Sequence, residues 1–250
     1  MSSAPTSGCA ASVLVTRLLC GPRRCMAEVA RTTVSVHYET GDPDLPVLTV
    51  ATPGAVRLPA TVVTPSLPAP GALSMGSGRL WQRSRSWRVT RWWRPARPVG
   101  LHPPVQRALP SLAVGFASLG VPVPEPVYDG LRPEALIGSG PGLTPSGDDL
   151  VAGALVAGHA TADPRFPRWR TATLATLGAA STTVVSRSLL HHACDGYATL
   201  ELADFVDAVC AGRDAASATS RLLAVGHTSG TALLHGALHA LTTHCLEGAA

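Results

Sequence analysis

An alternation of apolar and polar residues marks the first half of the chain. Val36 and Tyr38 alternate with polar neighbours, which is the period of a strand with one buried face. Residues 47–51 and 60–63 have the same character, with proline and glycine between them. We therefore predict a β-rich domain over residues 31–100.

The first thirty residues show no such period. Residues 1–30 are small, polar and rich in alanine, and we expect a poorly ordered leader or one short helix near 12–29. Their apolar run is interrupted by Arg17 and followed by Arg23 and Arg24, the wrong polarity for a signal peptide. No segment reaches the roughly 20 apolar residues of a membrane span, and we expect a cytoplasmic protein.

The second half of the chain has a helical pattern. One helix is predicted from Pro145 to about Ala160, and it is apolar or small on every side from Leu150 onward, which indicates a helix buried all round. Further helical patterns lie near 105–119 and in several segments between 168 and 246. The predicted fold class is thus α+β, with a predominantly α-helical domain over 101–250.

Two of the predicted helices share a sequence template, S-G-x-x-L-x-x-G-A-L. It occurs at Ser146–Leu155 and again at Ser229–Leu238. Small residues at the same offset allow two backbones to pack closely, so we expect two buried, glycine-capped helices. Their N-termini are then able to face one pocket.

The start of the first of these helices carries the strongest chemical signal. A loop with glycines at 138, 140 and 142 precedes Thr144, read as the N-cap, and Pro145, read as the first helical residue. Free amides at a helix N-terminus attract phosphate or carboxylate, although a glycine loop is equally a tight turn. We expect anion binding here.

Two acids lie in the first turn of this helix. Asp148 and Asp149 are adjacent, and successive helical positions differ by about 100 degrees. We expect one carboxylate to face the pocket, holding a substrate amide, a metal or a proton, and the other to support the loop. The alternative is that both only stabilise the helix dipole.

Two later segments complete the candidate site. His227 precedes the second template helix and suits a general acid or an oxyanion donor, or simply caps the helix. Arg187 suits a bidentate grip on an anion, or a structural ion pair with Asp148 or Asp149. The candidate catalytic residues are Asp148, Asp149 and His227, and the candidate substrate-binding residues are Gly140, Gly142, Thr144, Ser146, Gly147, Thr183, Ser186, Arg187, Thr228, Ser229 and Gly230.

Composition removes several kinds of chemistry. The chain has a net charge of +4 and no lysine, so its 20 basic residues are all arginine, which excludes a Schiff-base lysine and a Walker-type lysine. The six cysteines form no CxxC pair, and the histidines lack a metal-ligand pattern. No metal ligands are assigned, no cofactor is certain, and Mg²⁺ is the one candidate cofactor.

Residues 79–97 combine seven arginines and four tryptophans without an acid. Arginine interleaved with aromatic residues suits phosphate contacts and base stacking, so nucleic-acid binding is one reading. The tryptophans at 81, 87 and 93 share one parity, and a one-sided strand of the β-rich domain is the other reading.

Three motifs together resemble a known family. The G-x-G-x-G-L-T-P-S-G-D-D run at 138–149, T-T-x-x-S-R at 182–187 and G-H-T-S-G at 226–230 resemble the bacterial family of unassigned function that contains the third, H-type subunit of oxamate carbamoyltransferase from allantoin degradation. The resemblance covers about residues 130 to 240. It implies transfer of a carbamoyl group between oxamate and phosphate, together with partner subunits.

Three functions follow from these observations. The first is an enzyme, or an enzyme subunit, of carbamoyl transfer acting on oxamate, carbamoyl phosphate and phosphate. The second is a non-catalytic partner subunit that binds a small anion in the same pocket. The third is a nucleic-acid-binding protein working through residues 79–97. A small anionic ligand and a hetero-oligomer are expected partners for the first two, without a membrane.

Overall fold

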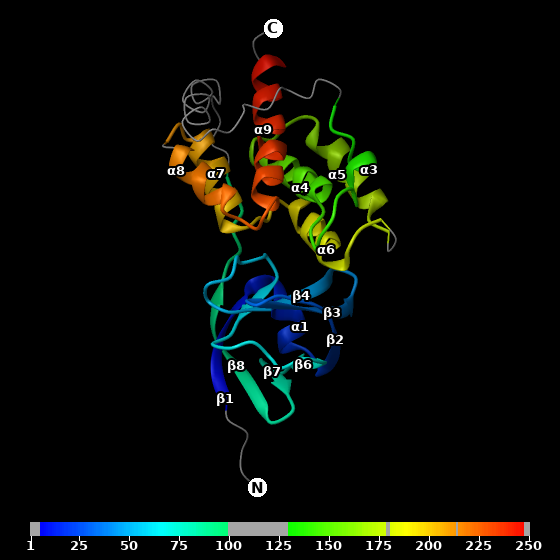
Figure 1. Ribbon diagram of the computed structural model, residues 1–250, viewed down its shortest axis with the longest axis vertical. Helices are drawn as coiled ribbons and strands as arrows, with labels where there is room; N and C mark the ends of the chain where they lie inside the picture. The colour runs from blue at the N-terminus through cyan, green and yellow to red at the C-terminus, as the bar shows by residue number, and fades with distance from the viewer. Residues whose placement is uncertain (1–5, 100–129, 179–180, 214, 248–250) are drawn as a thin grey trace. The chain divides into compact units, whose positions relative to one another are not determined.

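The computed structural model describes residues 6–99, 130–178, 181–213 and 215–247, without the side chains after residue 241. The chain divides into two compact units, Met1–Pro95 and Ala96–Ala250 (Figure 1). The first is built of strands and the second of helices, which confirms the α+β class. The helical pattern near 105–119 lies outside the described residues.

Eight strands form a closed barrel in the first unit. Their order around the barrel is β1-β5-β4-β3-β2-β6-β7-β8. The neighbours β1/β8 and β4/β5 are parallel and the other pairs antiparallel. The strands are β1 (Thr6–Ser12), β2 (Arg24–Arg31), β3 (Ser35–Asp42), β4 (Leu45–Ala51), β5 (Thr61–Val63), β6 (Leu73–Gly76), β7 (Arg79–Gln82) and β8 (Arg85–Trp93).

The alternation of apolar and polar residues in the sequence identifies side chains of the barrel core. Val36 and Tyr38 on β3 are fully buried and pack with inward residues of β4, such as Leu48 and Val50. The 3-10 helix η1 (Val13–Val15) and the helix α1 (Thr16–Cys20) add apolar side chains to the same core. Apolar contact between the strands and these short helices thus holds the unit together.

The expected leader contains one short helix, α1, but it also contains two strands that were not expected. Strand β1 pairs with β5 and β8, and strand β2 pairs with β3 and β6, so both are parts of the barrel wall. The residues of β1 are Gly, Ala, Ser, Thr and Cys, whose side chains differ too little in hydrophobicity to show a period of two. Pairing with its neighbours, rather than local pattern, makes this segment a strand.

The segment rich in arginine and tryptophan forms the hairpin β7–β8, as the strand reading predicts. Trp87 pairs with Leu80 and both face the core, whereas the guanidinium of Arg23 lies 4.8 Å from the ring centroid of Trp81. The shared parity of the tryptophans therefore does not mean a shared face. The turn at Arg83, which has a positive φ, separates the two strands and resets their register.

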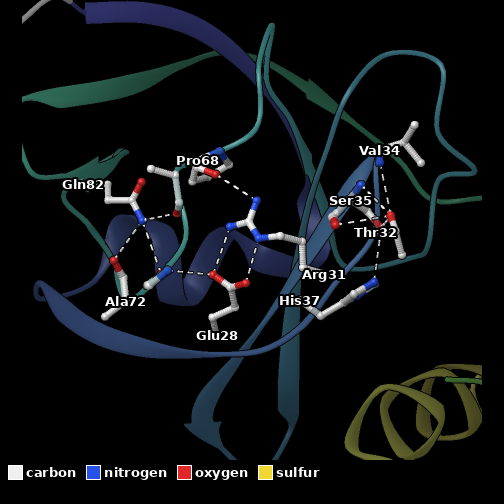
Figure 2. A network of polar contacts seen from close by, with 11 residues as sticks. Glu28, Arg31, Thr32, Val34, Ser35, His37, Pro68, Ala72 and Gln82 are labelled. Atoms are coloured by element: carbon white, nitrogen blue, oxygen red, sulfur yellow. Dashed lines mark hydrogen bonds and ion pairs between the residues drawn. The ribbon is translucent and has the colours of Figure 1, made fainter.

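A polar network ties β2 to the loop before β6 (Figure 2). The guanidinium of Arg31 donates to both carboxylate oxygens of Glu28, at 2.8 and 2.9 Å. The same carboxylate accepts the backbone amide of Gly71 at 2.8 Å, and the side-chain amide of Gln82 donates to the carbonyl of Ala69 at 2.8 Å. This network fixes the loop to the barrel wall.

The second unit is helical around two crossing helices, α4 and α9 (Figure 1). At the crossing, Gly153 of α4 lies against the carbonyl of Leu233, and Gly236 of α9 lies against the carbonyl of Leu150. The close packing predicted from the shared template is present. The helices are α3 (Pro133–Leu136), α4 (Ser146–Ala160), α5 (Phe166–Thr176), α6 (Val184–Ala193), α7 (Leu200–Cys210), α8 (Ala215–Leu223) and α9 (Ser229–Glu247). None of the described helices is long and apolar enough to cross a membrane.

Candidate functional site

The loop of glycines before α4 is fixed by Asp148. The Asp148 carboxylate is 1% exposed and accepts the backbone amide of Gly138 at 2.7 Å. Its second oxygen accepts the hydroxyl of Thr182. Both oxygens of this acid are therefore used to join the loop to the segment before α6, which is the supporting role expected for one of the two acids.

The same two segments meet at two further points. Gly138 has a φ of 85°, and a side chain there would collide with the carbonyl of Ser181. At the far end of the loop, the hydroxyl of Thr183 donates to the carbonyl of Leu143 at 2.6 Å. The glycine loop, residues 138–143, and the residues 181–183 thus form one rigid clamp, which we call the loop clamp.

The start of α9 joins this clamp through a pair of hydroxyl groups. The Thr144 and Ser229 hydroxyls lie 3.0 Å apart, within hydrogen-bond distance of each other, and both lie near enough to Asp149 to lower the pKa of its carboxyl group. We call these three side chains the hydroxyl–carboxyl triangle. It is the point where the two template helices begin side by side.

Asp149 is unusual for a carboxyl group. It is 5% exposed, and its Oδ2 atom is buried without a hydrogen-bond partner among the described residues. Burial raises the pKa of Asp149 to about 6, and the charge of Asp148 adds to the rise, against the hydrogen bonds from Ser229 and Thr144 that lower it. A buried acceptor left without a partner is costly to folding and marks a functional candidate.

One backbone amide in the first turn of each helix already has a partner. The backbone amide of Gly147 donates to the carbonyl of Ser139 at 2.9 Å, and that of Gly230 donates to the carbonyl of Val225 at 2.9 Å. Side chains at either glycine would collide with the end of the preceding helix, at Leu136 and Leu222 respectively. These glycines therefore serve close packing, and the amides of Gly147 and Gly230 are not available to an anion.

The prediction that Thr144 is the N-cap of α4 is wrong. The helix begins at Ser146, its N-cap is Pro145, and no side chain caps it. The hydroxyl of Thr144 contacts Ser229 instead. A long-range partner has replaced the local one that the sequence suggested.

The remaining glycines shape the surface of the loop. Gly140 has a φ of 110°, and a side chain there would lie 3.0 Å from the backbone amide of Ser146. Gly142 also has a positive φ, with open space around it. Ser146 itself is half-buried at the helix start.

The segment before α6 provides a cap and an arginine. The hydroxyl of Thr183 accepts the amide of the buried Ser186 at 3.0 Å and caps α6. Arg187 is half-buried one turn further on. Among the described residues it forms no ion pair with Asp148 or Asp149, so the structural ion pair considered from the sequence is not found.

His227 and Thr228 lie in the exposed turn before α9. The carbonyl of Thr228 accepts the amide of Ala232 at 3.1 Å. The structure therefore brings Thr144 and Ser229 to Asp149, while His227, Thr228 and Arg187 have no hydrogen bond or ion pair to either acid among the described residues.

Thr182 is the site residue that sequence reasoning missed. It lies beside Thr183 in the T-T motif, and only its hydroxyl reaches Asp148. Two adjacent hydroxyls before a helix were the signal, because one caps the helix and the other is free for a distant partner. Within the part of the chain described, no three His, Cys, Asp or Glu side chains gather as metal ligands do.

The helical unit is thus a scaffold that carries a small polar site at two adjoining helix starts. Residues 136–241 match the family model of oxamate carbamoyltransferase subunit AllH. The resemblance predicted from the sequence is confirmed over these residues, which include every candidate site residue. No solved structure matches the chain.

Proposed function

We propose that this chain is a subunit of a carbamoyltransferase, and that it binds oxamate or its carbamoyl derivative at the hydroxyl–carboxyl triangle. The match of residues 136–241 to a carbamoyltransferase subunit supports the reaction. We infer the position of the binding site from Asp149, a buried carboxyl group with one oxygen that has no hydrogen-bond partner among the described residues. The loop clamp keeps its surroundings rigid, as a precise site requires.

The proposed reaction moves a carbamoyl group between oxamate and phosphate. In one direction a phosphate oxygen attacks the carbamoyl carbon, the bond from that carbon to the oxamate nitrogen breaks, and the nitrogen takes a proton. The triangle holds the amide, Arg187 holds the anionic group, and His227 supplies the proton. Arg187 and His227 suit these roles because neither is engaged in an ion pair among the described residues.

We propose further that the chain works with partner subunits, since the matching family is described as a subunit. The alternative is that it binds the small ligand without catalysing the reaction. The buried carboxyl group of Asp149 suits binding as well as catalysis. Kinetic measurements with the partners present separate the two cases.

The test is phosphorolysis of oxalurate, measured as carbamoyl phosphate released by the chain alone, by the partner subunits alone and by the mixture. Asp149→Ala, Arg187→Ala and His227→Ala are each expected to lower the rate of the mixture by at least about tenfold. Arg168→Ala is the matched control, because Arg168 is exposed on α5 and outside the site. The proposal is wrong if all three variants keep the full rate.

The same assay identifies a non-catalytic role. Partner subunits that reach the full rate without this chain, but respond to oxamate differently when it is present, would make it a ligand-binding subunit. In that case Asp149→Ala changes KM and leaves kcat unchanged.

Nucleic-acid binding through residues 79–97 has less support. Exposed arginines remain on β8, at Arg88 and Arg91, but Trp87 is in the core and Trp81 lies beneath Arg23. Trp92, 43% exposed, is then the large aromatic surface left for stacking. Titration of a labelled oligo-dT strand at increasing salt tests this function, since contacts to phosphate weaken steeply with salt.

A further inference from the structure

The barrel unit is strongly basic. Residues 1–95 contain eleven arginines and four acids, so their net charge is +7, whereas residues 96–250 carry −3. Three of the four acids are in ion pairs, with Arg17, Arg24 and Arg31. The other arginines of the unit form no ion pair among the described residues. The positive charge of the unit is therefore not balanced within it.

The acids and most of the unpaired arginines belong to different sides of the barrel. The acids lie on β2, on β3 and in the turn after β3, whereas six arginines lie at residues 79–94. Around the barrel, β3 is four strands from β8 in either direction. The strands β1, β6, β7 and β8 contain no acid. The arginines of the hairpin β7–β8 thus have no acid on their own strands or on the neighbouring strands.

Two of these arginines face each other across the hairpin. Arg79 on β7 is the cross-strand partner of Arg88 on β8, and the next pair along is formed by the core residues Leu80 and Trp87. Successive residues of a strand point to opposite faces, so both arginine side chains lie on the outer face of the barrel. Like charges directly opposite each other destabilise a sheet, and an anionic group bound between them removes this cost.

A bulge brings a third arginine to the same face. On β1, Cys9 pairs with Val89 and the next residue pairs with Arg91, so Thr90 is an extra residue of β8. Regular alternation would place Arg91 on the face opposite to Arg88, but with the extra residue both are exposed. The hydroxyl of Thr90 donates to the carbonyl of Cys9 at 3.2 Å and so stabilises the bulge.

The neighbouring strands leave these arginines uncovered. The residue of β1 opposite Arg88 is Gly8, which has no side chain. On the other side, the guanidinium of Arg23 lies over the ring of Trp81 on β7, 4.8 Å from its centroid, and adds a further positive charge. We call Arg23, Arg79, Arg88 and Arg91 the arginine face.

The arginine face suits carboxylates of a protein better than a nucleic acid. Proteins that bind single strands stack the bases on aromatic rings, but the ring of Trp81 is covered by Arg23. Trp87 is in the core, and Trp92 pairs with a core residue of β1, which places it on the other face of β8. Trp93, at the end of the strand, is half-buried. Arginine, by contrast, is enriched at protein interfaces and pairs with carboxylates in a fork-like geometry.

We propose that the arginine face binds an acidic surface of a partner subunit, with one carboxylate between Arg79 and Arg88 and another against Arg91. The proposal rests on the proposed function for the existence of the partner subunits. It goes further by giving the position and the chemistry of the contact. The residues that match the family model, 136–241, do not include the barrel, so the contact belongs to a part of the chain outside the candidate site.

The test measures binding of the full chain to the partner subunits by biolayer interferometry. The double variant Arg88→Glu with Arg91→Glu is expected to weaken binding at least about tenfold, because it replaces attraction with repulsion. Raising the salt from about 50 to 300 mM should weaken the wild-type complex several-fold, since salt screens exposed charges, and should weaken the variant complex less. If the double variant does not fold, Arg88→Gln alone should still weaken binding several-fold.

The matched control is the double variant Arg57→Glu with Arg168→Glu. It changes the net charge by the same amount at two exposed arginines, one in the loop before β5 and one on α5, both outside the arginine face. It should bind the partner subunits as the wild type does. Far-UV circular dichroism checks that each variant is folded.

Four outcomes overturn the proposal: no complex with the partner subunits at low salt, full affinity of the Arg88/Arg91 variant, an equal loss in the control, or tighter binding of oligo-dT than of the partner subunits. The proposed function fails separately. If the complex depends on the arginine face but never consumes oxalurate, the contact is real and the carbamoyltransferase assignment is wrong. Oxalurate turnover by a complex that the Arg88/Arg91 variant forms normally gives the opposite result.

Discussion

Gly153 of α4 lies so close to Leu233 of α9 that a methyl group on the glycine would collide with the leucine carbonyl. The equivalent glycine of the second template, Gly236, stands in the same relation to Leu150. The two helices thus touch through their backbones at template-equivalent positions. This contact sets the distance between the helix starts that carry Thr144 and Ser229.

Gly153→Ala is expected to destabilise the protein by about 1 to 3 kcal/mol, because the added methyl group overpacks the crossing. The sign of this change distinguishes the two effects, because replacing glycine by alanine in a helix interior otherwise stabilises a protein by roughly 0.5 to 1 kcal/mol. Far-UV circular dichroism during chemical denaturation measures the change. Gly178→Ala is the matched control, because Gly178 has open space around it and should stay within experimental error.

Asp148 and Thr182 are expected to act as a pair. Asp148→Ala leaves the amide of Gly138 and the hydroxyl of Thr182 without their acceptor, at a cost of roughly 2 to 4 kcal/mol. Thr182→Val should cost less, because Asp148 keeps the Gly138 amide. A double-mutant cycle on unfolding free energies checks the pairing, and strictly additive effects would show that the loop clamp does not depend on this bond.

Asp149 is expected to make the protein less stable as the pH rises. Its pKa is raised from 3.8 to about 6 in the folded state, so between these values the unfolded chain loses its proton first and folding weakens. Asp149→Asn should remove this loss and increase stability at about pH 7.5 by ~2 kcal/mol. Unfolding free energies of both proteins across this range test the expectation, and a less stable variant at neutral pH would contradict it.

Glu28 is expected to show the opposite pH dependence. The hydrogen bond from Arg31 holds the pKa of Glu28 below its usual range, so its contribution is present at neutral pH and is lost as the pH falls through that lowered pKa. Glu28→Gln should cost about 0.5 to 1 kcal/mol at neutral pH, because the pair is partly exposed. The difference should vanish in strong acid.

Tryptophan fluorescence measures this effect, because four of the five tryptophans lie in the barrel unit. Glu39→Gln is the control, since Glu39 is exposed on the neighbouring strand and forms no ion pair within the described residues. Equal losses in the two variants would mean that the network of Figure 2 contributes nothing beyond a surface charge.

Much of the fold follows from local pattern, and the rest follows from distant partners. Val36 and Tyr38 show their buried face in the sequence because their neighbours are polar. Strand β1 shows no such alternation, because glycine, alanine and serine differ little in hydrophobicity. Helix α4 could be predicted from its apolar run, but its first residue could not. The hydroxyl of Thr144 contacts the hydroxyl of Ser229 and does not cap the helix.

The candidate site divides in the same way. The shared template predicts that two helix starts come together, and Thr144 and Ser229 are indeed in contact. Adjacent acids on a helix must point apart, but nothing local says which of them faces Thr182 and which faces Ser229. Those neighbours lie more than thirty residues away in the chain. Only the tertiary structure therefore separates a carboxyl group that fixes a loop from one that has a buried oxygen without a hydrogen-bond partner among the described residues.

The pairing of β1 with β8 has a consequence for how the barrel unit folds. These strands are the first and last of the unit, and Thr6 pairs with Ser86, so the seam closes across almost the whole length of the unit. Contacts so distant along the chain form slowly, because a long loop must be ordered before they stabilise anything. Until β8 has been synthesised, β1 has an open edge, and edges of this kind recruit other chains. Strand β1 therefore has an unpaired edge during most of the synthesis of the barrel unit, and a paired neighbour on each side after folding.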